Sequence, residues 1–297
     1  MRHIRATLLI CASAALFPAG LFSQAISQTS ASINSGPNGF GGTASFAAPL
    51  RFTARAVTNA PYSGEEVTEQ VRTLADGTHI TQDSPARKVY RDSLGRTRME
   101  RPLFGGMAMA GRVPESPTIV EITDPVAQVK YTLDTINKVA HRQQLPAPPE
   151  LPAARNAASV RSGTLGGAIA APGAAMAGGG GARVAAPPDN ARPQMTSEKL
   201  GTQTIEGVLA EGTRTTTTWA IGAQGNDRPI TVVSEMWMSP VLKVMILNKS
   251  TDPRNGDHTQ KLTNISQSEP PAYLFQPPPE YSVVDETGAF TIKWGSQ

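Results

Sequence analysis

Hydrophobic and polar residues alternate along two stretches of the chain, residues 50–145 and residues 196–293. Val129, Tyr131 and Leu133 are one example, because they fall on one side of an extended chain while the polar residues between them fall on the other. This period of two predicts β-strands. Neither stretch contains a long apolar stripe with the spacing of a helix, so the predicted fold class is mainly β.

Turn sequences separate the predicted strands and indicate hairpins. Asp76 and Gly77 join two alternating segments, and a tight turn there needs the positive φ that glycine adopts without strain. The longest predicted strand, residues 208–219, is rich in β-branched threonine, and a short helical turn is expected within residues 268–275. A meander of about ten strands must curl, close or split into two packed sheets. The residues therefore predict a meander of antiparallel hairpins with little helix.

Two tracts lack this pattern. Residues 26–49 are rich in Ser, Gly, Ala and Asn and are predicted to be a disordered N-terminal segment. In residues 146–195, Ala, Gly and Pro make up 31 of the 50 residues, a composition that buries too little apolar area to offset backbone ordering. This second tract is predicted to be a disordered linker between the two halves of the meander.

The N-terminus has the features of an export signal. Arg2 and Arg5 precede an apolar stretch over residues 6–22, and Ala25 ends a segment with small residues at the cleavage positions. Residues 1–25 are therefore predicted to be a Sec-type signal peptide. The mature protein is expected to be periplasmic or secreted, with no transmembrane segment after cleavage.

Charge and cysteine content narrow the possible chemistry. The only cysteine, Cys11, lies in the predicted signal peptide, so the mature chain has no disulfide, no thiol nucleophile and no cysteine metal site. Loss of two arginines on cleavage leaves 25 Lys and Arg against 24 Asp and Glu, which lowers the formal charge from +3 to +1. Because nucleic-acid binding usually needs a clustered basic excess, no nucleic-acid partner is expected.

No local motif identifies a reaction. The mature chain has three histidines, His79, His141 and His258, and it lacks a nucleophile elbow, a zinc-protease motif and a phosphate loop. The protein is predicted not to be an enzyme and to bind no cofactor or metal. A secreted hydrolase is the third hypothesis, and it would require one of these histidines to meet a serine or a carboxylate in space.

A basic cluster surrounds one predicted hairpin and includes Arg91, Arg96 and Arg98. These residues are candidates for contact with an anionic surface, such as lipid headgroups or a cell-wall polymer. The alternative is a solvated strand face with cross-strand ion pairs, which the alternation of Arg96, Arg98 and Glu100 favours.

Candidate ligand-lining residues are apolar and aromatic. Met236 and Trp237 fall on opposite faces of one predicted strand, and methionine adapts to irregular partners. Together with Tyr131 and Leu133 they are predicted to line an apolar groove. Such a set can equally be ordinary packed core.

Four segments together resemble the LolA-like superfamily, which includes the LolA lipoprotein carrier and RseB/MucB-type domains. They are Pro61-Tyr62-Ser63-Gly64, residues 124–138, residues 235–240, and a closing element of Leu262-Thr263-Asn264-Ile265, Leu274-Phe275-Gln276-Pro277 and Glu280-Tyr281-Ser282-Val283. The chain also looks like uncharacterised exported proteins of Acidobacteria. The resemblance implies one strongly curved antiparallel sheet, an unclosed half-barrel with helical cover over its concave side. Members of the superfamily hold acyl chains or an apolar peptide in that concavity.

These observations predict a non-catalytic exported binding module. Its apolar groove would hold a lipid, a lipoprotein or an exposed protein segment, and contact with a membrane surface fits the basic cluster. The alternative is a cell-envelope structural or interaction protein with a fully packed core.

Overall fold

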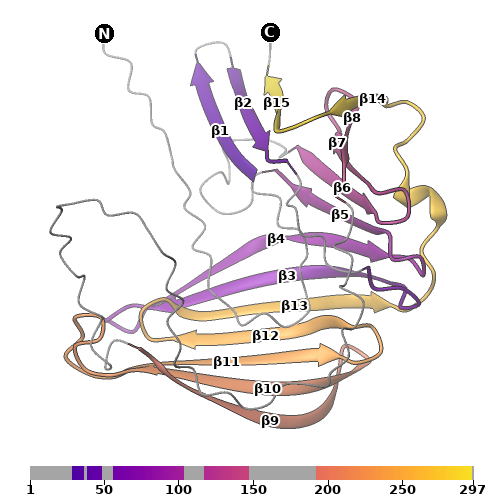
Figure 1. Cartoon of the computed structure of the whole chain (residues 1–297). Helices are drawn as coiled ribbons and strands as arrows, with labels where there is room; N and C mark the ends of the chain where they lie inside the picture. The colour runs from indigo at the N-terminus through magenta and orange to yellow at the C-terminus, as the bar shows by residue number, and fades with distance from the viewer. Residues whose placement is uncertain (1–28, 37–38, 49–55, 104–116, 147–191, 296–297) are drawn as a thin grey trace, which may run out of the picture.

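The computed structural model describes residues 29–36, 39–48, 56–103, 117–146 and 192–295. Within these residues the chain is mainly β-strand, as predicted, and it forms a twelve-stranded sheet and a three-stranded sheet (Figure 1). The larger sheet is not closed, because its outer strands do not pair with each other. The predicted signal peptide, residues 1–25, lies outside the described residues, as does most of the predicted linker.

The twelve strands of the large sheet follow an order that differs from their order in the chain. From one edge to the other they are β14 (Ser282–Glu286), β8 (Val139–Gln144), β7 (Val129–Asp134), β6 (Thr118–Asp124), β5 (Thr97–Pro102), β4 (His79–Arg91), β3 (Tyr62–Thr73), β13 (Gly256–Ser266), β12 (Val244–Asp252), β11 (Ile230–Ser239), β10 (Val208–Trp219) and β9 (Gln194–Ile205). In this sheet order, the seven strands that begin with β4 and end with β9 lie across the lower part of Figure 1. Strands β5 to β8 turn upward from them.

The two alternating blocks of the sequence form one sheet, as predicted. Strand β3 of the first block pairs antiparallel with β13 of the second, with Glu66 opposite Leu262 and Val67 opposite Lys261. This ladder is the joint between the halves. The prediction that the two blocks share one hydrogen-bonded layer is therefore confirmed.

Local turn chemistry is also confirmed. Gly77 has a φ of 85°, and the Asp76 carboxylate accepts a hydrogen bond from the Thr78 amide at 2.9 Å, which closes the β3–β4 turn. Strand β10 has the predicted bounds, and a 3-10 turn, η3 (Ala272–Phe275), lies where a helical turn is expected.

The predicted disorder of residues 26–49 is wrong for most of that segment. Strands β1 (Thr29–Gly36) and β2 (Gly39–Phe46) form a hairpin there, and β2 pairs with β15 (Phe290–Gly295) near the C-terminus. The Phe46 and Phe290 rings stack with centroids 5.0 Å apart, and both residues are buried beside Ile119. This distant apolar partner supplies the burial that the local composition lacks.

Three further details depart from the prediction. Strand β14 runs parallel to β8, so the sheet is mixed and not purely antiparallel. Strand β9 begins at Gln194, two residues inside the predicted linker. The expected helical cover is reduced, among the described residues, to the single turn η3.

Apolar burial is concentrated in three clusters. One lies under η3 and contains Val120, Ile122, Leu133, Ala140 and Phe275. A second joins the small sheet to the opposite face of β6, and a third lies at one end of β10 to β13, around Trp237, Ile246 and Leu262. In the part of the chain that the structure describes, no helix has the length and apolar character needed to span a membrane.

Candidate functional site

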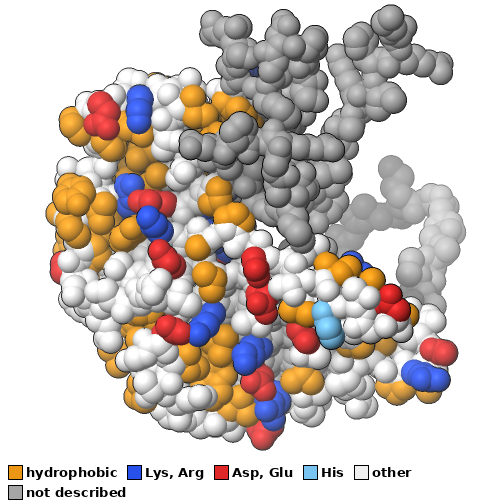
Figure 2. All heavy atoms as spheres, turned by 180° about the vertical axis from the view of Figure 1, so that it is seen from behind, with side chains coloured by type: hydrophobic (Ala, Val, Ile, Leu, Met, Phe, Trp, Pro, Cys, Tyr) orange, Lys and Arg blue, Asp and Glu red, His pale blue; other side chains and the backbone are white. Residues whose placement is uncertain are grey.

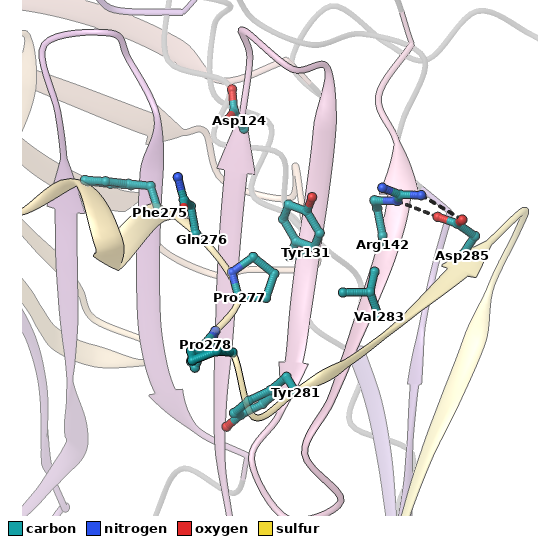
Figure 3. Close-up of a pocket in the computed structure, with 11 residues that line it drawn as sticks. Asp124, Tyr131, Arg142, Phe275, Gln276, Pro277, Pro278, Tyr281, Val283 and Asp285 are labelled. Carbon is teal, nitrogen blue, oxygen red and sulfur yellow. Dashed lines mark hydrogen bonds and ion pairs between the residues drawn. The ribbon is translucent and has the colours of Figure 1, made fainter.

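A groove with a cavity volume of about 600 Å³ lies between strands β6 to β8 and the segment that runs from η3 to β14 (Figure 3). We call it the η3–β14 groove. Aromatic rings, prolines and one ion pair surround it. The lining residues are Asp124, Tyr131, Arg142, Phe275, Gln276, Pro277, Pro278, Pro279, Tyr281, Val283 and Asp285.

One wall of the groove is the chain that follows β13. Arg98 of β5 donates a hydrogen bond to the Leu274 carbonyl at 2.9 Å, and the Arg96 guanidinium lies 5.1 Å from the centre of the Phe275 ring. Glu269 accepts a hydrogen bond from the Ser93 amide at 3.0 Å. These contacts hold η3 against the sheet, so the prolines that follow it have a fixed position.

The floor of the groove comes from the sheet. Tyr131 of β7 lies between the proline wall and Arg142 of β8, in the centre of the view in Figure 3. At the end of the groove, the Lys138 ammonium lies 5.1 Å from the centre of the Tyr281 ring. Aromatic faces next to proline rings form an apolar surface that a ligand can cover.

An ion pair closes the other side of the groove. The Arg142 guanidinium donates two hydrogen bonds to Asp285, one of them from Nη2 to Oδ2 at 2.7 Å, because β8 and β14 pair in parallel with these residues opposite each other (Figure 3). The hydrogen bonds from Arg142 lower the pKa of Asp285, and the same bonds raise the pKa of Arg142. Both side chains are exposed, so a ligand can reach the pair.

The same ion pair also lines a second cavity, of about 620 Å³. That cavity is bounded by Val129, Gln143 and residues 285–288. Near it, His141 pairs with Glu286 at 2.8 Å and stacks on Phe290 at 4.3 Å. Arg142 and Asp285 therefore line both cavities.

The structure separates the four predicted lining residues. Tyr131 lines the groove, and Leu133 is 1% exposed in the cluster beneath it. Met236 and Trp237 lie on β11. Six strands of the sheet lie between β11 and β7, namely β6, β5, β4, β3, β13 and β12. Met236 is exposed, and Trp237 is buried against Gly212 in another cluster. The four residues do not form one groove.

The predicted surface role of Arg91 needs correction. Arg91 is 6% exposed, its Nε donates to the Ala60 carbonyl at 2.9 Å, and its Nη2 donates to the Leu242 carbonyl. Burial of the guanidinium lowers the pKa of Arg91. Arg96 and Arg98 form ion pairs with Asp92 and Glu100, and only 15% and 13% of their side chains are exposed. The alternative expectation, a solvated face with cross-strand ion pairs, holds only for the presence of ion pairs, because Arg98 pairs within its own strand, Arg96 pairs with the residue four positions before it, and both side chains are largely buried.

The three histidines are not gathered in one place. His79 lies at the β3–β4 hairpin with its Nδ1 3.0 Å from the Thr73 hydroxyl, His141 pairs with Glu286, and His258 lies on β13. His141 thus meets a carboxylate, one of the two partners that the hydrolase hypothesis names, and none of the three histidines is hydrogen-bonded to a described serine. Within the described residues, no group of three His, Cys, Asp or Glu side chains could hold a metal ion.

Sequence reasoning missed the groove's ion pair and its proline wall. Arg142 and Asp285 are 143 positions apart, and only the parallel pairing of β14 with β8 brings them together. Pro277, Pro278 and Pro279 gave a usable signal, since a run of prolines beside Phe275 and Tyr281 is a stiff, apolar segment.

Comparisons with known proteins add little. No family model matches the chain, and no curated protein matches it. Among solved structures, an uncharacterized conserved protein from Thermus thermophilus is similar with a TM-score of 0.33 and 8% sequence identity, over 76% of this chain and 91% of that chain. A likeness this weak assigns neither fold nor function.

Proposed function

We propose that this protein is a non-catalytic binding module that holds an extended segment of another protein in the η3–β14 groove. The observation that carries the proposal is the lining of the groove. Tyr131, Tyr281 and the prolines offer apolar ring surfaces, and the exposed Arg142–Asp285 pair offers charged donors and acceptors at the rim. We also propose that the protein is exported, on the strength of Arg2, Arg5 and the apolar residues after them.

Among lipid, lipoprotein and protein segment, this lining favours the protein segment. An acyl chain is held by burial of its apolar area, at about 25 cal/mol per Å², and this needs an enclosed apolar tunnel. The η3–β14 groove has an ion pair and the Gln276 amide on its surface. An extended peptide matches such a surface, because its side chains can cover the rings while its backbone amides bond to polar groups.

The test uses a random linear peptide library displayed on phage and selected on the purified protein. Enriched peptides are synthesised and titrated calorimetrically against the protein and two variants. Tyr131→Ala removes a ring from the floor of the groove. Tyr273→Ala is the matched control, since Tyr273 belongs to the same wall segment but is 73% exposed and does not line the groove.

We expect enriched peptides to lose at least about tenfold in affinity with Tyr131→Ala, because a central aromatic contact typically contributes about 1–2 kcal/mol or more. Affinity for Tyr273→Ala should stay within about twofold. Failure to enrich any peptide, or equal loss in both variants, would overturn the proposal. Tight binding of a fluorescent fatty acid that Tyr131→Ala abolishes would instead assign the groove to lipid.

A further inference from the structure

A row of uncharged polar side chains crosses seven strands on the sheet face opposite the η3–β14 groove. Residues directly opposite each other on neighbouring strands share a face, so the strand pairing places one residue of each strand in line. The row consists of Ser197, Thr215, Ser234, Ser250, His258, Gln70 and Gln82. At about 4.8 Å for each step between strands, it extends over roughly 29 Å.

The neighbouring row on the same face has the same character. It consists of Lys199, Thr213, Met236, Asn248, Gln260, Thr68 and Ser84. Only Lys199, on the edge strand, is charged. We call the two rows together the uncharged face.

The opposite face of the same strands is different. Its corresponding row contains Glu198, Arg214, Glu235, Lys249, Thr259, Glu69 and Asp83. Figure 2 shows acidic and basic side chains in a column that crosses the lower strands. Arg214 pairs with Glu235 at 2.8 Å, as expected of a solvated face. In these rows, charge is therefore concentrated on one side of this half of the sheet.

Several groups of the uncharged face have unused hydrogen-bonding capacity. The side chains of Thr215, Ser250 and His258 form no hydrogen bond to another described residue, and each is only half-buried. Trp219 extends the face at the end of β10 and carries the Arg254 guanidinium 4.9 Å from its ring centre. The face thus offers hydroxyl, amide and imidazole groups, and the Trp219–Arg254 stack closes one end of it.

We propose that the uncharged face binds a neutral polysaccharide. Sugar hydroxyls are donors and acceptors at once, and so are the serine, threonine, asparagine and glutamine side chains of the two rows, which makes the two surfaces complementary. An extended polymer can follow a row through several strands, because hydroxyl and amide groups recur on each of them. Within the two rows a polyanion or polycation would meet Lys199 as the one charged side chain, whereas the row of Glu198, Arg214 and Glu235 on the other side of these strands would suit a neutral partner less well.

The experiment is affinity electrophoresis of the purified protein in gels that contain one of three neutral polysaccharides, hydroxyethyl cellulose, dextran or galactomannan. A gel with polygalacturonate, a polyanion, serves as the charge comparison. The test variant is Thr215→Val with Ser250→Ala, which removes two hydroxyls and keeps the shape of the strand surface. The matched control is Thr216→Val, the same change one residue along β10, on the charged face.

We expect retardation by at least one neutral polysaccharide, a loss of at least about threefold in apparent affinity for the double variant, and no change for Thr216→Val. Retardation should persist in about 0.5 M NaCl, because no ion pair contributes to it. No retardation by any of the three polymers, retardation by polygalacturonate alone, or equal loss in both variants would overturn the proposal. Urea unfolding of each variant shows whether it is folded, so that a folding defect is not read as lost binding.

Discussion

The two halves of the twelve-stranded sheet are built from the same hairpin pattern and yet differ in what covers them. In the half formed by β4 to β8, η3 packs on one face and the three-stranded sheet on the other, and strand β7 is buried along nearly its whole length. In the half formed by β9 to β13, packed core is limited to one end, and β9 is exposed almost throughout. The first half is therefore stabilised by layers packed on both of its faces, whereas much of the second half is exposed to solvent.

This difference shows where stability and recognition are expected to lie. Covered strands bury apolar side chains and gain most of their stability from that burial. Strands with open faces can instead carry different kinds of polar side chain on their two sides, with charged groups on one side and hydroxyls and amides on the other. Four substitutions test this division.

The largest effect is expected from Phe275→Ala, which removes the cover from the first half. Phe275 is 1% exposed and packs on Val120 and Ile122, so its loss should lower the free energy of unfolding by about 3–5 kcal/mol. Urea unfolding measures the change. Tyr273→Ala in the same turn should change it by about 0.5 kcal/mol or less. Equal effects of the two substitutions would mean that η3 is not a packing element.

Arg91→Met tests the joint between the halves. The buried guanidinium reaches from β4 to the Leu242 carbonyl in the β11–β12 turn, and the substitution leaves two buried carbonyls without donors. We expect a loss of about 2–3 kcal/mol in urea unfolding. Arg72→Met, at an exposed position of β3, serves as the control and should be nearly neutral. An unchanged midpoint for Arg91→Met would show that the halves are held together by the β3–β13 ladder alone.

Gly212→Ala probes the small core of the second half. A Cβ at this position would meet three carbons of the Trp237 ring at 2.7 to 2.8 Å, so the ring must shift, at a cost of about 1–2 kcal/mol. Gly288→Ala, where nothing lies within 4 Å, is the matched control and should have little effect. Thermal or urea unfolding of both variants gives the comparison. A neutral Gly212→Ala would indicate a looser core than the one described.

The smallest effect is expected at an exposed end of the second half. Hydrogen bonds from Arg254 lower the pKa of Asp252 below its ordinary value of 3.8. The ion pair therefore stabilises the fold fully above that ordinary value, and its contribution is lost as the pH falls through the lower pKa of the folded state. Asp252→Asn should cost about 0.5 kcal/mol at pH 7, and the cost should shrink as the pH falls below the ordinary pKa of 3.8 and through the lower pKa of the folded state. Urea unfolding at each pH measures the difference in free energy of unfolding between Asp252→Asn and the parent protein. If this difference did not change between pH 7 and the acidic range, the ion pair with Arg254 would not be its source.

Local sequence was enough for much of the fold. The alternation around Tyr131 predicted β7, and the threonine-rich stretch predicted β10 with its observed bounds. Local sequence did not predict β2. Its glycine-rich sequence carries no sign of its partner, because Phe46 packs on Phe290, which lies 244 positions away in the chain. Strand β14 was missed for a related reason, since its pairing with β8 is parallel and links segments far apart in the chain.

The candidate site was predicted only in part. Tyr131 was found because it is aromatic and alternates with polar residues, but Met236 and Trp237 were assigned to the same groove without knowledge of strand order. Arg142 and Asp285 carry no local signal, since each is an ordinary charged residue until the strands align. Export, the LolA-like resemblance and the absence of catalysis remain predictions.

The β3–β13 joint has a consequence for how the chain acquires its fold. Glu66 and Leu262 are neighbours in the sheet but are separated by 196 positions, so β3 has no partner on that side until residues near the C-terminus have been synthesised. Contacts at such separation slow folding, and an unpaired strand edge can meanwhile join other chains. A nascent chain of this design benefits from a chaperone that keeps it unfolded until its C-terminal strands are complete.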